Sequence, residues 1–74
     1  MTQSDLYDLL EDLRWTDRIT VKKQMELVGF SQLNDRCNLR HNKSSLAATK
    51  RTLIYLRSRG CVIDFVEYAD FRIC

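Results

Sequence analysis

Apolar residues recur at helical spacing near the start of the chain. They fall at i, i+3, i+4 and i+7 and predict one buried stripe, made of Leu6, Leu9, Leu10 and Leu13. We therefore predict a first helix from about Asp5 to Arg14, with Ser4 as its N-cap. Trp15 lies off the stripe, and we expect its ring to close over the edge of the core.

Two glycines mark the ends of two further helices. Gly29 and Gly60 each follow a helical pattern, at the point where a left-handed backbone commonly ends a helix. The helices that they close are predicted over about Val21 to Val28 and Leu46 to Ser58, with Thr20 as the first N-cap. Their apolar faces point to a helical domain with a small core.

The helix before Gly60 has two faces of different character. Ser44 or Ser45 is its expected N-cap. The expected inward stripe consists of Leu46, Thr49, Leu53 and Leu56. The expected outward face consists of Ala47, Ala48, Arg51, Tyr55 and Ser58. Small side chains followed by Arg51 and Tyr55 would let this helix approach another molecule closely.

The remaining segments differ in how clearly they are patterned. Residues 30–43 are polar and basic, and they form either an expanded turn or a turn with an inserted short helix near 31–37. Side chains alternate with a period of two over residues 61–66, and residues 67–69 and 70–74 follow. This pattern predicts a strand, a tight turn and a second strand. Three helices and a C-terminal hairpin make an α+β fold, mainly α, in one domain over residues 1–74.

This order of elements, and the run SLAATKRTLIYLRSRGCVI from Ser45, resemble the winged helix-turn-helix domains of biotin-repressor-type and DeoR-type regulators. Ser45 matches the serine that opens the recognition helix in those domains, and Leu56 and Gly60 match the residues that close it. The resemblance covers about residues 20–73 and implies a winged helix whose third helix enters the DNA major groove. The long segment 30–44 and an acidic wing depart from the family pattern.

Charge sharpens the expected function. The chain has 74 residues, with 45% hydrophobic and 30% charged side chains, which is an ordinary composition for one small globular domain. Its net charge is +2, but residues 18–59 carry ten Lys or Arg against Glu26 and Asp35, a net +8. Residues 1–17 have a net charge of −4, and residues 60–74 a net charge of −2. A basic middle between acidic ends favours a polyanionic partner.

The candidate site residues follow from a helix placed in a DNA groove. Arginine can read guanine and alanine can contact a thymine methyl, so the base-reading candidates are Ser44, Ser45, Ala48, Arg51 and Tyr55. The phosphate candidates are Arg36, Arg40, Lys43 and Lys50. We expect a small transcriptional regulator of double-stranded DNA, of the size found in phage and plasmid proteins, that binds as a dimer.

The acidic hairpin leaves a second function open. Asp64, Glu67 and Asp70 would be repelled by phosphate, and Tyr68 lies among them. Glu67 and Tyr68 are therefore candidates for contact with a partner protein or a second copy. In this alternative the fold is an interaction module that inhibits or tethers a partner protein.

Catalytic and metal chemistry find little support. Cys37 and His41 with Cys61 and Cys74 lack the two short-spaced pairs of a structural zinc site, and nothing in the sequence completes a Cys37–His41 nucleophile pair. Two glycines cannot form a phosphate loop. We expect no enzyme activity, metal or cofactor. Three cysteines read as reduced thiols, and no secretory or membrane-spanning segment is apparent, so we expect a cytoplasmic protein.

Overall fold

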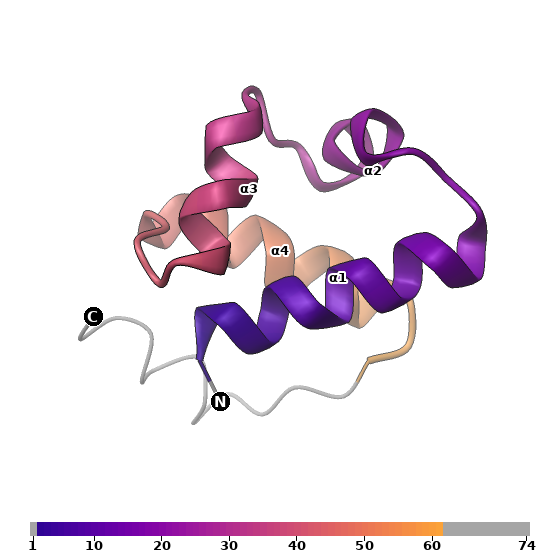
Figure 1. Cartoon of the computed structure of the whole chain (residues 1–74). Coiled ribbons are helices and arrows are strands. Elements are labelled where there is room, and N and C mark those ends of the chain that lie inside the picture. Colours follow the sequence, from indigo (N-terminus) through magenta and orange to yellow (C-terminus); the bar gives the residue numbers. More distant parts are fainter. Residues whose placement is uncertain (1, 62–74) are drawn as a thin grey trace.

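A computed structural model describes residues 2–61 of the chain, and these residues form four helices (Figure 1). Their bounds are Gln3–Asp17 for α1, Val21–Val28 for α2, Leu33–Arg40 for α3 and Leu46–Ser58 for α4. No strand occurs between residues 2 and 61. None of the four helices is long and apolar enough to span a membrane.

Helix α1 begins two residues before the predicted start. Thr2, not Ser4, is its N-cap: the Thr2 hydroxyl accepts from the Asp5 N–H at 3.3 Å, and the Asp5 carboxylate accepts from the Thr2 N–H at 2.8 Å. This reciprocal pair is a capping box, which satisfies two backbone donors at once. The helix ends at Asp17, three residues after the predicted end at Arg14, and the left-handed backbone of its C-cap Arg18 (φ 54°) terminates it.

The caps of α2 and α4 confirm the sequence prediction. The hydroxyls of Thr20 and Ser45 accept from the backbone N–H three residues ahead, at 3.1 and 3.2 Å. Gly29 and Gly60 both have positive φ angles, 96° and 95°, which residues with a side chain rarely adopt. Local chemistry therefore determines both ends of each of these helices.

The core lies where α1 meets α3 and α4 and where α2 meets α4 (Figure 1). Its buried apolar side chains are Leu6, Leu10, Val28, Phe30, Leu39, Ala48, Leu53, Tyr55 and Leu56. The predicted stripe of α1 is confirmed, since Leu9 and Leu13 pack against this core while remaining partly exposed. Each helix thus buries one face, and the opposite faces are free to carry function.

The α+β winged-helix prediction is wrong. Residues 2–61 hold four helices rather than three, and they contribute no strand. The additional helix, α3, lies within residues 30–43, for which the sequence predicted either an expanded turn or a turn with an inserted short helix. Its inward positions are Arg36 and Leu39, whereas Leu33 and Cys37 are exposed, so its apolar pattern is weak in the sequence. The predicted hairpin, from residue 62 onward, lies outside the described residues.

Two individual burial predictions also fail. Trp15, which we expected to close over the edge of the core, is 69% exposed. The Arg14 guanidinium lies 4.4 Å from the centre of its ring. Leu46 is 49% exposed, because it lies at the edge of the buried face of α4 rather than within it. Both residues remain apolar surface on the folded chain.

Candidate nucleic-acid interface

Helix α4 presents a continuous exposed face along its full length. The exposed residues after its first position recur at three- and four-residue steps: Ala47, Lys50, Arg51, Ile54, Arg57 and Ser58. Three of these six are cations and none is an anion. Ile54, 60% exposed, lies between Lys50 and Arg57 along this face. We call these six residues the α4 face.

The α4 face is rotated from the face that the sequence predicted. Ala48 and Tyr55, two base-reading candidates, are 5% and 8% exposed and lie in the core. Around the helix axis, the centre of the observed exposed face lies roughly 60° from the centre of the predicted face. This rotation is smaller than the step of about 100° between successive residues. Thr52 is a main cause, because it is fully buried while its hydroxyl donates to the Ala48 carbonyl at 2.9 Å. A threonine satisfied in this way can occupy a core position.

The N-terminal end of α4 is held by the first turn of α1. Gln3 is buried, and its Nε2 donates to the Ser44 carbonyl at 3.2 Å and to Oγ1 of Thr49 at 3.3 Å. The Ser44 N–H in turn donates to Oε1 of Gln3 at 2.9 Å. Ser44, a base-reading candidate, is therefore half-buried with its backbone engaged. Ser45, the next candidate, is exposed and caps the helix.

Arg36 does not belong to the exposed basic surface. It is 7% exposed, forms an ion pair with Glu11, and donates from Nη1 to the Tyr7 hydroxyl at 3.0 Å. Its guanidinium also lies 4.7 Å from the centre of the Tyr7 ring. Arg14 shares the same carboxylate, with Nη2 at 3.0 Å from Glu11. The residue predicted to contact phosphate thus joins α3 to α1.

The other phosphate candidates are exposed. Lys50 lies on the α4 face and Lys43 in the turn before it, while Arg40 ends α3 with its guanidinium 5.9 Å from the Tyr7 ring centre. Arg51 is the one base-reading candidate within the α4 face. Its Cδ would lie 3.5 Å from a Cβ added at Gly29, so its stem passes the end of α2.

Four further residues complete the α4 face: Ala47, Ile54, Arg57 and Ser58. The sequence analysis placed Ala47 and Ser58 on the outward face but did not place Ile54 or Arg57 there, and it gave none of the four a site role. Their signal was available in the sequence. Lys50, Ile54 and Arg57 follow one another at four- and three-residue steps, and choosing Thr52 rather than Leu46 as an inward position would have found them.

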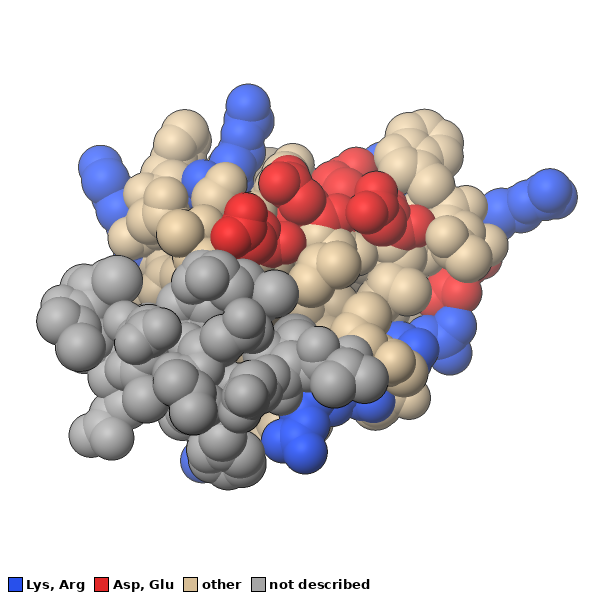
Figure 2. Space-filling view, turned by 90° about the horizontal axis from the view of Figure 1, so that it is seen from below, with Lys and Arg blue, Asp and Glu red and all other residues tan. Residues whose placement is uncertain are grey.

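Helix α1 carries the opposite charge. Its exposed carboxylates are Asp5, Asp8 and Asp12, which share one helix face. Figure 2 shows the visible carboxylates gathered mainly in one patch, with Lys and Arg side chains around the outline of the molecule. A polyanion would therefore be repelled by the exposed carboxylates of α1 and attracted by the cations of the α4 face.

The remaining candidates add no second site. Glu67 and Tyr68 lie outside the described residues. Cys37 and His41 are exposed, and within residues 2–61 no three His, Cys, Asp or Glu side chains are grouped as metal ligands. Comparison with family models, curated proteins and solved structures finds no match to this chain.

Proposed function

We propose that this protein is a small cytoplasmic protein that binds double-stranded DNA through the α4 face and regulates transcription. One observation carries the proposal: the exposed side of α4 bears Lys50, Arg51 and Arg57 without an acidic residue. A B-DNA major groove is about 12 Å wide and admits one α-helix. A helix of 13 residues extends for about 20 Å, enough to cross such a groove.

The two ends of the α4 face suit different tasks. Arg51 lies in the N-terminal half with Ala47, where side chains of an inserted helix meet base edges. Lys43, Lys50 and Arg40 are exposed cations that can neutralise phosphates and position the helix without reading sequence. Arg36, which is bound to Glu11 and Tyr7, makes no DNA contact in this proposal. A single module makes few contacts, so we expect two copies to bind one site.

The test is a titration of a labelled duplex at several salt concentrations. Each neutralised phosphate contributes a slope of about −0.9 to the plot of log affinity against log salt. With three to five phosphate contacts we expect a slope of about −3 to −4.5. A slope near zero, or no binding at low salt, would reject the proposal.

A charge-swapped pair of variants serves as a matched control. Lys50→Glu should abolish measurable binding at moderate salt, because it places a carboxylate in the centre of the α4 face. Lys23→Glu changes the same charge at an exposed position of α2 and should weaken binding much less. Equal losses in both variants would mean that net charge, not the α4 face, determines binding.

A second candidate function is binding of a partner protein, favoured by the exposed side of α1. Asp5, Asp8, Asp12 and Trp15 follow one another at three- and four-residue steps, and the Trp15 ring is 69% exposed. Exposed tryptophans are enriched at protein interfaces. Trp15→Ala should leave duplex affinity unchanged and remove partner binding, whereas Lys50→Glu should do the reverse.

A further inference from the structure

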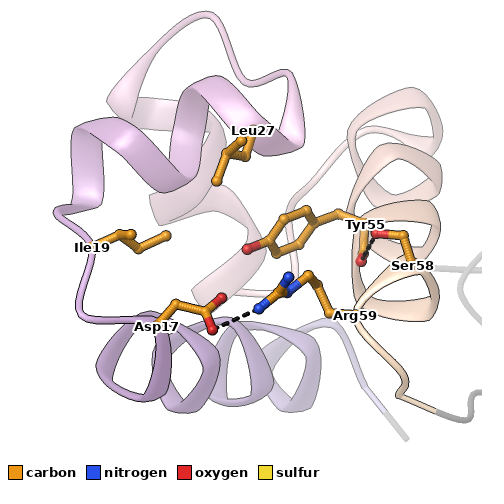
Figure 3. Close-up of a pocket in the computed structure, with 6 residues that line it drawn as sticks. All are labelled: Asp17, Ile19, Leu27, Tyr55, Ser58 and Arg59. Carbon is orange, nitrogen blue, oxygen red and sulfur yellow. Dashed lines mark hydrogen bonds and ion pairs between the residues drawn. The ribbon is translucent and has the colours of Figure 1, made fainter.

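A hollow of about 300 Å³ opens between the end of α1, helix α2 and the last turns of α4. Its lining residues, shown in Figure 3, are Asp17, Ile19, Leu27, Tyr55, Ser58 and Arg59. The volume is at the lower end of the range of about 300–1,000 Å³ found for ligand pockets. It is large enough for a molecule the size of one substituted ring.

The Tyr55 side chain points into this hollow from α4 (Figure 3). The residue is 8% exposed, and its hydroxyl is buried without a hydrogen-bond partner among the described residues. Buried polar groups are nearly always hydrogen-bonded, and each exception calls for an explanation. Phenylalanine would fill the same core position without this unpaired hydroxyl, so the hydroxyl is available to a molecule that enters the hollow.

The walls define what that molecule is. Ile19 and Leu27 supply apolar surface on one side. On the other side Nη2 of Arg59 donates to Oδ1 of Asp17 at 2.6 Å, so the two formal charges lining the hollow are already paired. A charged ligand would meet one like charge and would have to compete with this ion pair. A neutral ligand leaves it intact.

We propose that this hollow binds a small neutral molecule with an apolar ring and one hydrogen-bond acceptor, which accepts from the Tyr55 hydroxyl. The ring lies against Ile19 and Leu27, and the acceptor satisfies the one buried hydroxyl of the hollow. The hollow shares Ser58 with the α4 face but none of that face's cations, so this proposal does not rest on the proposed DNA-binding function. Its test therefore measures ligand binding alone.

The probe is benzamide, a neutral ring with a carbonyl acceptor, and binding is followed by ¹H–¹⁵N shift changes of the full chain. We expect a saturable titration, with the largest shifts at residues 17–19, 27 and 55–59. Benzoate has the same shape but a negative charge, and we expect it to bind several times more weakly. Absence of saturable benzamide binding, or equal affinity for benzoate, would overturn the proposal.

Two variants test the contacts, and a third is the control. Tyr55→Phe keeps the buried ring and should weaken benzamide binding about three- to tenfold, the range for one hydrogen bond. Leu27→Ala removes part of an apolar wall at a half-exposed position and should weaken it about two- to fivefold. Tyr7→Phe removes a hydroxyl that bonds Arg36 instead, and should leave affinity unchanged. Wild-type affinity in Tyr55→Phe would exclude the hydroxyl as the ligand contact.

Discussion

Helices α3 and α4 each carry an arginine from the basic segment 18–59, but one arginine is buried and the other is exposed. In α3, Arg36 turns inward and joins Glu11 and Tyr7 of α1. In α4, Arg51 is exposed, and its Cδ lies near Gly29 at the end of α2. Both were counted in one basic segment of the chain. The difference shows that a run of positive charge does not define a basic surface until the fold has selected which cations remain exposed.

The two helices also differ in what stabilises them. Helix α4 buries six residues, and its N-cap is a serine with a regular capping bond. Helix α3 is eight residues long and buries only Arg36 and Leu39. A short helix with few apolar contacts depends on tertiary partners rather than on its own propensity. Four substitutions test how α3 and α4 differ, and the largest effect is expected where a tertiary contact is lost.

The largest effect is expected for Arg36→Ala. The change removes the partner of Glu11 and of the Tyr7 hydroxyl at a nearly buried site, so unfolding free energy should fall by about 2–4 kcal/mol. Urea unfolding followed by circular dichroism measures it. Arg40→Ala, an exposed cation on the same helix, is the control and should change stability by less than about 0.5 kcal/mol. Equal effects would show that Arg36 does not hold α3 to α1.

The next effect concerns the contact that positions the start of α4. Gln3→Ala removes three hydrogen bonds from a buried amide and should cost about 1–3 kcal/mol of unfolding free energy. Amide hydrogen exchange should also become faster at Ser44 and Thr49. Asn34→Ala removes an exposed amide from α3 and should alter neither quantity. Unchanged exchange in the Gln3 variant would mean that α4 begins independently of α1.

Arg51→Ala tests whether the outward arginine reads bases. If it does, discrimination between a preferred duplex and a random one should fall by about 1–3 kcal/mol. Lys50→Ala, on the same face, should weaken both duplexes alike, since phosphate contacts carry no sequence information. Competition titrations at one fixed salt concentration measure both. If Arg51→Ala lowers the affinity for both duplexes by the same factor, Arg51 contacts phosphate and does not read a base.

The smallest effect is expected at the helix starts. Ser45→Ala removes the side chain that accepts from the Ala48 N–H and should cost about 1 kcal/mol. Ser31→Ala, ahead of α3, removes only a 3.5 Å contact to Asp35 on the surface and should cost a few tenths of that. Thermal unfolding can rank the two. A larger loss of stability in Ser31→Ala than in Ser45→Ala would mean that the residue ahead of α3 contributes more to stability than the N-cap of α4.

The sequence analysis succeeded where local chemistry decides and failed where packing does. The bounds of α2 and α4 and the cap Thr20 were predicted as found, and Ser45 is one of the two serines predicted to cap α4. For α3 the sequence did not decide between a turn and a short helix, because one of its two buried residues is Arg36, which gives no apolar signal. In the candidate interface Arg51 was predicted on the outward face and Lys50 as a phosphate contact, and both are exposed. Ala48 and Tyr55 were also predicted on the outward face, but both are buried. Thr52, which is buried with its hydroxyl bonded to the Ala48 carbonyl, shifted that face.

The sequence by itself determined where the helices α2 and α4 begin and end, because a capping hydroxyl and a glycine act over three or four residues. It also determined the apolar stripe of α1. Only the tertiary structure decided that Arg36 is internal, that Gln3 holds the turn before α4, and that Tyr55 faces a hollow beside Leu27. Each of these depends on residues far apart in the chain, and their contacts follow from helix packing rather than from periodicity.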